Sequence, residues 1–108
     1  MNTFLSIPRS DDGYVNATAL CRTAGKEFND YTRLDYTQEF LHEASSLTGL
    51  SCNELIQHRD GEMWVHLIVA VNCGTWLSPR IAFEVVNWVY DLMAGRLPFG
   101  QPPTEVIQ

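Results

Sequence analysis

Residues 12–21 read DGYVNATALC, and this stretch decides how the fold begins. Its first two residues, an Asp-Gly pair, favour a tight hairpin because glycine tolerates the positive φ that such turns require. Tyr14 and Val15 then continue as a short return strand. Asn16 is a favoured N-cap, since its side-chain oxygen can accept a hydrogen bond from a free N–H of the first helical turn. The stretch therefore predicts a hairpin that runs directly into a helix at residues 17–23.

Working outward from this stretch, two pairs of β-prone runs stand out. The first pair is residues 3–7 and 14–15, on either side of the turn just described. The second pair is residues 55–58 and 63–66, with an Asp-Gly pair at residues 60–61 that suits a two-residue turn. The sequence therefore predicts two short β-hairpins.

Capping residues and apolar residues at helical spacing predict about five helices. These are residues 17–23, 27–34, 35–48, 67–73 and 79–94. The last begins at Ser78-Pro79, because serine caps a helix and proline is tolerated in its first turn. Its expected core face carries apolar residues at helical spacing, namely Ile81, Val85, Trp88 and Leu92. Strands and helices in this order do not alternate as βαβ units, so the predicted fold class is α+β.

The length of 108 residues suits a single domain. With 45% hydrophobic residues, the chain can bury a core without disulfides or metals. Near the end of the chain, Pro98, Gly100, Pro102 and Pro103 interrupt regular structure. We therefore expect a domain at residues 1–96 and a proline-rich tail or linker at residues 97–108.

The three cysteines, Cys21, Cys52 and Cys73, include no closely spaced pair. An odd number without ligand spacing fits neither a disulfide framework nor a zinc site. Buried, reduced thiols are expected instead, and they indicate a reducing compartment such as cytoplasm or nucleus. The longest apolar run, residues 64–71, is far shorter than the roughly 20 residues of a spanning helix, and residues 1–12 lack the pattern of a secretion signal. The sequence therefore predicts no metal, no cofactor and no membrane partner.

The distribution of charge bears on nucleic-acid binding. Seven basic and thirteen acidic residues give a net charge of −6, whereas DNA-binding domains tend to be basic. Residues 1–34 are balanced, with four charges of each sign. Residues 35–66 contain Arg59 alone against six acidic residues, so most of the excess acid comes from the middle of the chain. A neutral or mildly basic face could therefore lie opposite an acidic one.

Three stretches, taken in order, match the pattern of a known family. They are residues 12–21, residues 25–33 (GKEFNDYTR), and residues 63–66 (MWVH) followed by 74–83 (GTWLSPRIAF). Together they resemble the KilA-N domain of phages and large DNA viruses, which is similar to the fungal APSES DNA-binding domain. The resemblance extends over about residues 9–92. It implies a winged helix-turn-helix fold, and it implies DNA binding rather than catalysis.

The sequence departs from the family pattern at a few positions. Tyr31 stands where the family usually has tryptophan, and Leu67 stands where it often has proline. Ala82-Phe83 has the aromatic and the alanine in swapped order. In this family the second hairpin is thought to act as a wing; here it is short, and Arg59 is its only basic residue.

The candidate DNA-binding residues lie around the second predicted helix and on this hairpin. Arginine and lysine bind phosphates, while asparagine and arginine also read base edges. The resemblance implies that the second helix and the wing approach the duplex. The candidates are Arg22, Lys26, Asn29, Thr32, Arg33 and Arg59. The alternative from the residues alone is an ordinary solvated surface, because Glu27 and Asp30 are interspersed among them.

No motif of the sequence indicates catalysis. There is no nucleophile elbow, no phosphate-binding glycine loop and no metalloprotease helix. We therefore expect no catalytic residues.

The leading hypothesis is a non-catalytic module that binds double-stranded DNA with a sequence preference and weak nonspecific affinity, in a phage or viral type regulator of transcription. It would act in the cytoplasm of a bacterial host, or in the nucleus or cytoplasm of a cell infected by a virus. The alternative is a protein-interaction module that kept the fold and lost the basic surface, an alternative that the acid count favours.

Overall fold

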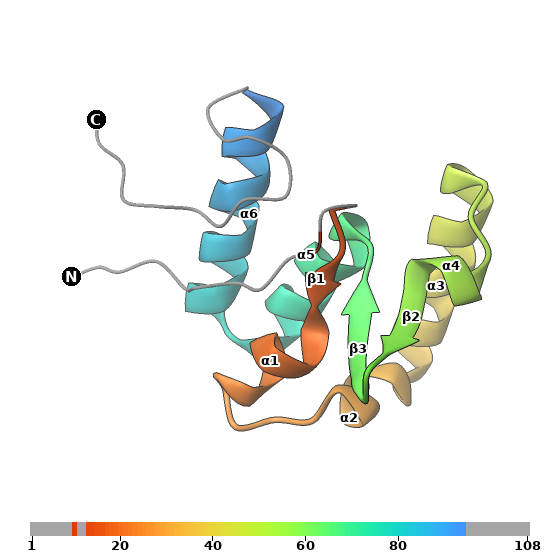
Figure 1. Cartoon of the computed structure of the whole chain (residues 1–108), viewed down its shortest axis with the longest axis horizontal. Helices are drawn as coiled ribbons and strands as arrows, with labels where there is room; N and C mark the ends of the chain where they lie inside the picture. Colours follow the sequence, from red (N-terminus) through yellow and green to blue (C-terminus); the bar gives the residue numbers. More distant parts are fainter. Residues whose placement is uncertain (1–9, 11–12, 95–108) are drawn as a thin grey trace.

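The computed structural model of the chain describes residue 10 and residues 13–94, except for the side chain of Leu92. Within these residues it contains six helices and three strands, and it confirms the α+β class (Figure 1). The elements in chain order are β1 (Val15–Asn16), α1 (Ala17–Arg22), α2 (Phe28–Thr32), α3 (Asp35–Thr48), α4 (Cys52–Leu55), β2 (Ile56–Arg59), β3 (Glu62–Val65), α5 (Leu67–Leu77) and α6 (Pro79–Met93). The predicted tail at 97–108 and the predicted strand at 3–7 lie outside the described residues.

The three strands form one antiparallel sheet in the order β1-β3-β2. Val65 of β3 is paired with Val15 on one side and with Ile56 on the other, so β3 is central. Asp60 and Gly61 join β2 to β3 with φ of 52° and 79°. Two consecutive positive φ values are those of a primed hairpin turn, which confirms the predicted Asp-Gly turn. The sheet places β1 beside the second hairpin.

The cap predicted at the start of the first helix is present. Asn16 Oδ1 accepts a hydrogen bond from Ala19 N at 3.0 Å. The helix α4 was not predicted: Ser51 and Glu54 form a capping box around one helical turn, which is too short to show helical periodicity. His66, expected in a strand, instead caps α5, because its Nδ1 accepts from Ile68 N at 3.1 Å.

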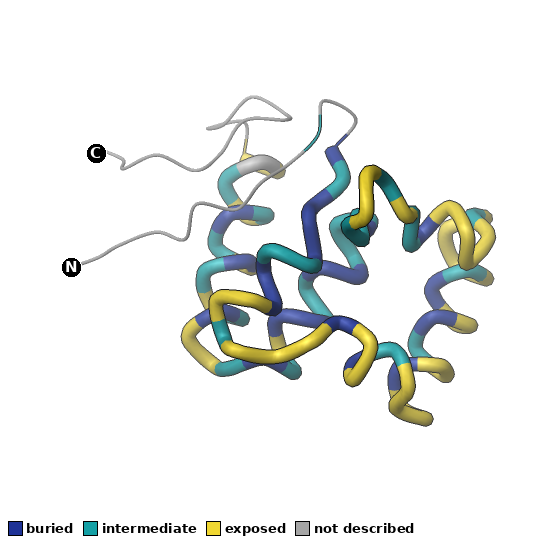
Figure 2. The backbone as a smooth tube through the Cα atoms, turned by 60° about the horizontal axis from the view of Figure 1, so that its bottom comes forward, coloured by how far each residue is buried: buried dark blue, intermediate teal, exposed yellow. Residues whose placement is uncertain are grey.

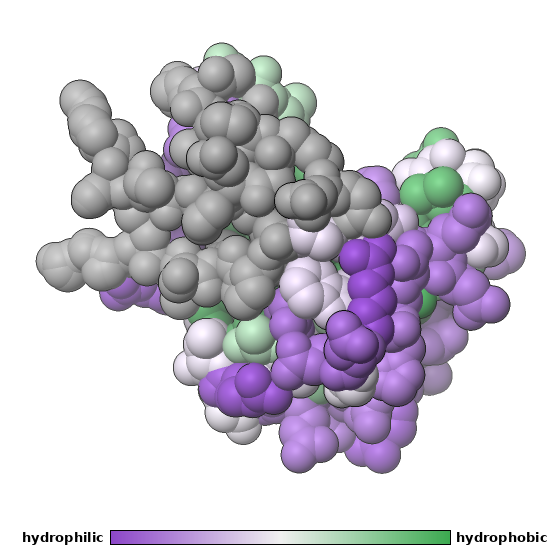
Figure 3. All heavy atoms as spheres, in the orientation of Figure 1, coloured by the Kyte–Doolittle hydropathy of each residue, from purple (hydrophilic) through white to green (hydrophobic). Residues whose placement is uncertain are grey.

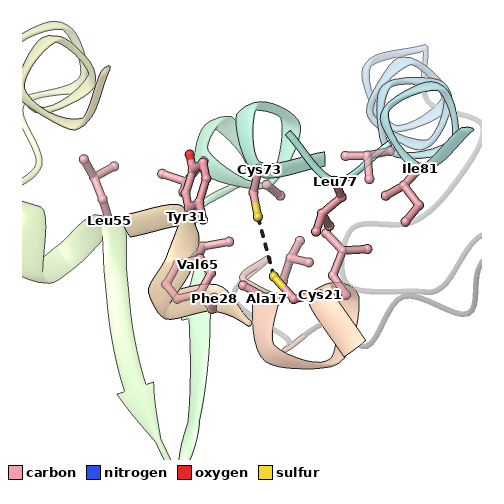
Figure 4. Packing of buried hydrophobic residues seen from close by; sticks show 14 of the residues in the cluster. Ala17, Cys21, Phe28, Tyr31, Leu55, Val65, Cys73, Leu77 and Ile81 are labelled. Carbon is pink, nitrogen blue, oxygen red and sulfur yellow. Dashed lines mark hydrogen bonds between the residues drawn. The ribbon is translucent and has the colours of Figure 1, made fainter. Parts of the chain in front are cut away.

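The core combines residues of the sheet with residues of all six described helices, and Figure 4 shows part of it. On α6 the predicted inward face is confirmed for Ile81, Val85 and Trp88, which are buried, while the side chain of Leu92 lies outside what is described. Sγ of Cys21 on α1 and Sγ of Cys73 on α5 are 3.8 Å apart at the centre of this packing. The hydrogen bond with Cys21, together with burial, raises the pKa of Cys73, so its thiol stays protonated.

One cysteine departs from expectation. Cys52 is exposed, because it begins the short helix α4 at the surface. The prediction of buried thiols is therefore wrong for Cys52 and confirmed for the other two.

Helix α3 is joined to the rest of the molecule by polar as well as apolar contacts. Tyr31 of α2 donates from its hydroxyl to Asn72 Oδ1 of α5, and Asn72 Nδ2 donates to the hydroxyl of Tyr36 on α3, each at 2.6 Å. Burial raises the pKa of Tyr31, which keeps this hydroxyl a donor. Most of the outward surface of α3 is exposed (Figure 2). None of the helices in the described part of the chain is long and apolar enough to cross a bilayer.

Candidate nucleic-acid interface

A groove of about 620 Å³ opens between the α1–α2 region and the tip of the β2–β3 hairpin. We call it the hairpin groove. These elements gather at the bottom of Figure 1, and the same region of Figure 3 is dominated by hydrophilic residues. Its lining residues are Thr18, Arg22, Gly25, Lys26, Glu27, Phe28, Asn29, His58, Gly61 and Met63. The groove thus brings together three of the six candidate residues, Arg22, Lys26 and Asn29.

Polar contacts between α1 and β3 hold the two walls of the hairpin groove in place. The backbone N–H of Met63 donates to the hydroxyl of Thr18 at 2.9 Å. Asn16 Nδ2 donates to Glu62 Oε1, and Arg22 forms an ion pair with the other oxygen of Glu62 at 3.6 Å. The same short segment that starts the helix therefore also fixes the position of the hairpin.

Lys26 lies in the loop before α2, just ahead of the predicted helix at 27–34. Its Nζ is 4.7 Å from the centre of the Trp76 ring and 3.5 Å from the Trp76 carbonyl oxygen. A cation over an exposed aromatic ring is attracted by roughly 0.5–1 kcal/mol. This contact turns the ammonium group toward Trp76 at the end of α5, which is not a lining residue of the groove, and it leaves Lys26 exposed.

Helix α2 is shorter than the predicted 27–34, since only Phe28–Thr32 are helical. Phe28 and Tyr31 are buried, and the centre of the Tyr31 ring is 5.6 Å from that of the Trp76 ring on α5. With that face fixed inward, Asn29 is exposed, and its side-chain amide has no hydrogen-bond partner in the described part of the chain. Asn29 is therefore a free donor and acceptor on the groove wall.

Two further candidates lie at the end of α2, outside the groove lining. The hydroxyl of Thr32 donates to the Asn29 carbonyl at 3.1 Å, so it is satisfied within its own helix. Arg33 follows the last residue of α2 and pairs with Asp30 at 2.8 Å, with both side chains exposed. An exposed pair of this kind stabilises the protein by at most about 1 kcal/mol, so Arg33 can leave it at little cost.

The hairpin places His58 and Arg59 on opposite faces of the sheet, because successive side chains of a strand alternate. His58 is opposite Met63 in the register, and both line the groove. Arg59 instead packs its guanidinium 5.0 Å from the centre of the Tyr14 ring and donates to Gln57 Oε1 at 2.6 Å. His58 was missed from the sequence, although the period-two alternation from the apolar Ile56 would have pointed to it.

The charge of the hairpin groove differs from that of the whole chain. Among the described residues, Arg22 and Lys26 line it against Glu27 as the only acidic lining residue, while the whole chain carries −6. Elsewhere in the described residues, no three His, Cys, Asp or Glu side chains come together as a metal site requires. The groove therefore offers cations and an amide, the groups that bind phosphates and base edges.

Comparison with protein families gives a single clear result: the model of the KilA-N domain matches residues 1–95. The chain belongs to the KilA-N family. The prediction from the three sequence stretches is thereby confirmed. The family is generally DNA-binding and generally non-catalytic.

The relatives of this KilA-N domain are viral proteins. A KilA-N domain-containing protein of Acanthamoeba polyphaga mimivirus is 34% identical over 85 residues, covering 79% of this chain and 22% of the relative. A second one from the same virus is 27% identical over 85 residues, covering 79% and 18%. An uncharacterized protein of fowlpox virus is 24% identical over 94 residues, covering 77% and 62%. The chain thus spans about a fifth of the mimivirus relatives that it matches. No solved structure matches it significantly.

Proposed function

We propose that this KilA-N domain is a non-catalytic module that binds double-stranded DNA through the hairpin groove, in a phage or viral type regulator. The observation that carries the proposal is the convergence of Arg22, Lys26 and Asn29 on one groove opposite the hairpin tip. In this assignment α1 and α2 form the helix-turn-helix unit and the β2–β3 hairpin is the wing.

The lining residues divide into two roles. Arg22 and Lys26 contact phosphates, because a cation on a flexible stem binds the backbone without reading sequence. Asn29 reads a base edge, since an unpartnered amide can donate and accept at once, as adenine requires. His58 approaches the duplex from the opposite wall. In this proposal Asn29 on α2 determines the sequence preference, and Arg22 and Lys26, which precede α2, provide affinity for any duplex.

The other three candidates receive weaker roles. Arg33 is exposed at the end of α2 and can exchange Asp30 for a phosphate. The Thr32 hydroxyl donates to the Asn29 carbonyl within its own helix. The Arg59 guanidinium donates to Gln57 and packs on the Tyr14 ring. We therefore expect Arg33 to contribute to affinity, and Thr32 and Arg59 to act by supporting α2 and the hairpin.

Net charge limits the strength of nonspecific binding. The chain carries −6 and only two cations line the groove among the described residues, so long-range repulsion opposes the approach of any duplex. Binding is expected to be weak on random sequence and to fall steeply as salt rises. The target sequence can therefore be found by selection from a random duplex pool at low salt, about 20 mM, where the Debye length exceeds ~20 Å.

The test is a fluorescence anisotropy titration of the selected duplex at several salt concentrations. Lys26→Ala should weaken binding on all sequences and reduce the log–log salt slope by roughly one. Asn29→Ala should cost about 1–3 kcal/mol at one base position and relax preference there. Arg80→Ala removes an exposed arginine on α6, outside the groove, and is the matched control. The absence of binding to any duplex at about 20 mM salt would refute the proposal.

The second candidate function is a protein-interaction module that does not bind DNA. It is favoured by the acid excess and by the pairing of Arg22 with Glu62 and of Arg33 with Asp30, which neutralises two candidate cations. The low-salt titration separates the two, because the interaction module predicts no binding to the pool.

A further inference from the structure

A second groove, of about 400 Å³, lies between α3 and α6 with α5 as its floor. We call it the helical groove. Within the part of the chain that the structure describes, it shares no lining residue with the hairpin groove. Its lining is mostly apolar and comes from all three helices, with Phe40 from α3, Leu67, Ile68 and Val71 from α5, and Val89 from α6. The fold thus leaves a channel between two helices whose walls do not close against each other.

Exposed apolar residues continue both walls of this groove. On α3, Tyr36 and Leu47 lie four residues before and seven residues after Phe40, which places all three on one stripe, and they are 56% and 80% exposed. Tyr36 accepts from Asn72, a lining residue, so this stripe borders the groove. On α6, Val86 and Met93 flank Val89 and are 48% and 83% exposed. A contiguous apolar surface of this kind marks an interaction site in soluble proteins.

The charges around the helical groove are almost all negative. The three helices contain one Lys or Arg residue, which is Arg80, and it is paired with Glu84. Their acidic residues are Asp35, Glu39, Glu43, Glu84 and Asp91. Glu39 precedes Phe40 directly and Glu43 follows it by about one helical turn; both are exposed, and they line a shallow hollow on α3 with Gln38 and His42. A second copy of the chain bound face to face would bring these carboxylates together, which is unfavourable, whereas a basic partner would neutralise them.

We propose that the helical groove binds an amphipathic helix of a partner protein, with lysine or arginine flanking its apolar stripe. A channel between two helices suits a third helix, whose apolar side chains at positions i, i+3/4 and i+7 fill it. From Tyr36 to Leu47 the α3 wall is about 16 Å long at 1.5 Å per residue, enough for about three turns of the partner. The site is separate from the proposed DNA-binding groove and does not depend on it.

The test uses two designed helical peptides with the same leucine stripe, one flanked by lysine and one by glutamate. Their binding to the ¹⁵N-labelled domain is followed by amide chemical shifts. The lysine peptide should bind more tightly and shift amides of α3, α5 and α6 around the groove. The double variant Glu39→Lys/Glu43→Lys should weaken the lysine peptide by about tenfold and bind the glutamate peptide better, because it turns attractions into repulsions.

The matched control is Asp30→Lys, a reversal of an exposed acid on α2, away from the groove. It should leave the preference for the lysine peptide in place. Three results would overturn the proposal: no shifts around the groove with either peptide, a preference that the double variant does not reverse, or self-association of the domain in sedimentation that Leu47→Lys abolishes. The last would assign the groove to a second copy. Each of these results leaves the DNA titration unaffected, so the two proposals fail separately.

Discussion

The hairpin groove and the helical groove differ in what lines them and in what builds them. The first is polar and is formed by short elements, namely the loop before α2, the five-residue α2 and a two-residue turn. The second is apolar and lies between the 14-residue α3 and the 15-residue α6. The net charge of the chain therefore does not describe the surface of either groove. Helix α3 carries Asp35, Glu39 and Glu43 and no basic residue, while two of the candidate cations, Arg22 and Lys26, line the other groove.

The two grooves also differ in the contacts that fix the position of their walls. The walls of the hairpin groove depend on a few polar contacts, such as that between Thr18 and Met63, and on the turn at Gly61. The helical groove is supported by the buried core beneath α5 and α6. Substitutions can therefore affect both grooves, one of them, or neither.

Trp88→Ala should abolish both grooves. Trp88 is 2% exposed and anchors α6 on α5, and truncating a buried tryptophan costs about 3–5 kcal/mol. A domain of this size has little stability beyond that, so we expect little folded protein by circular dichroism at 25 °C. Phe83→Ala, on the exposed side of the same helix, is the control and should melt nearly as the wild type does. An unchanged melt for Trp88→Ala would show that α6 does not pack through this face.

Gly61→Ala should affect the hairpin groove alone. Gly61 has φ of 79°, and an added Cβ would have no atom within 4 Å, so only backbone strain is introduced. A left-handed conformation costs a non-glycine residue about 1–2 kcal/mol. We expect lower stability in urea unfolding and weaker DNA binding, with peptide binding at the helical groove unchanged. Equal losses at both grooves would contradict the separation proposed here.

Thr37→Val should stabilise the domain and change neither groove. Thr37 is fully buried on α3, and its hydroxyl has no hydrogen-bond partner in the described part of the chain. Valine has nearly the same shape and the same β-branching, so it removes the desolvated hydroxyl without a new helix cost. We expect a gain of about 1 kcal/mol in the free energy of unfolding. A loss of stability would mean that the hydroxyl is satisfied.

His66, at the start of α5, should make the stability of the domain depend on pH. Burial lowers the pKa of His66 below its ordinary value near 6.5, and its Nδ1 must be unprotonated to cap α5. The unfolded chain therefore takes up the proton first. The contribution of the His66 cap to the free energy of unfolding is complete above about pH 6.5 and is lost as the pH falls below that value.

Urea unfolding at pH 7.5 and 5.5 measures this contribution. His66→Asn keeps a capping oxygen and removes the titration, so its stability should differ less between the two pH values than that of the wild type. Identical pH dependence in the two proteins would show that His66 is not the group responsible.

Local chemistry explains the parts of the fold that the sequence predicts well. The Asp-Gly turn, the Asn16 cap and the start of α6 at Pro79 each depend on residues a few positions apart. The helix α4 was missed because a single turn has no periodicity, and its last residue, Leu55, resembles the start of the following strand. Both boundaries of the predicted 1–96 domain fall outside the described residues, so they stay a prediction.

The candidate interface was harder to predict because it depends on contacts between distant residues. Lys26 is positioned by Trp76, fifty residues later, and no local pattern reveals that contact. Arg59 faces away from the groove because of the strand register. A shift of one residue in that register would reverse the faces, and the sequence does not fix the register to that precision. The helical groove was not foreseen at all, since an apolar residue such as Val89 is equally consistent with the core.

The central claim is that a duplex meets the hairpin groove and leaves the helical groove free. An amide chemical-shift titration of the ¹⁵N-labelled domain with a selected duplex, at about 20 mM salt, tests this directly. We expect shifts at residues 22–29 and 58–61, with the amides of α3 and α6 unchanged. Shifts confined to α3, α5 and α6, or no shifts with any duplex, would contradict it.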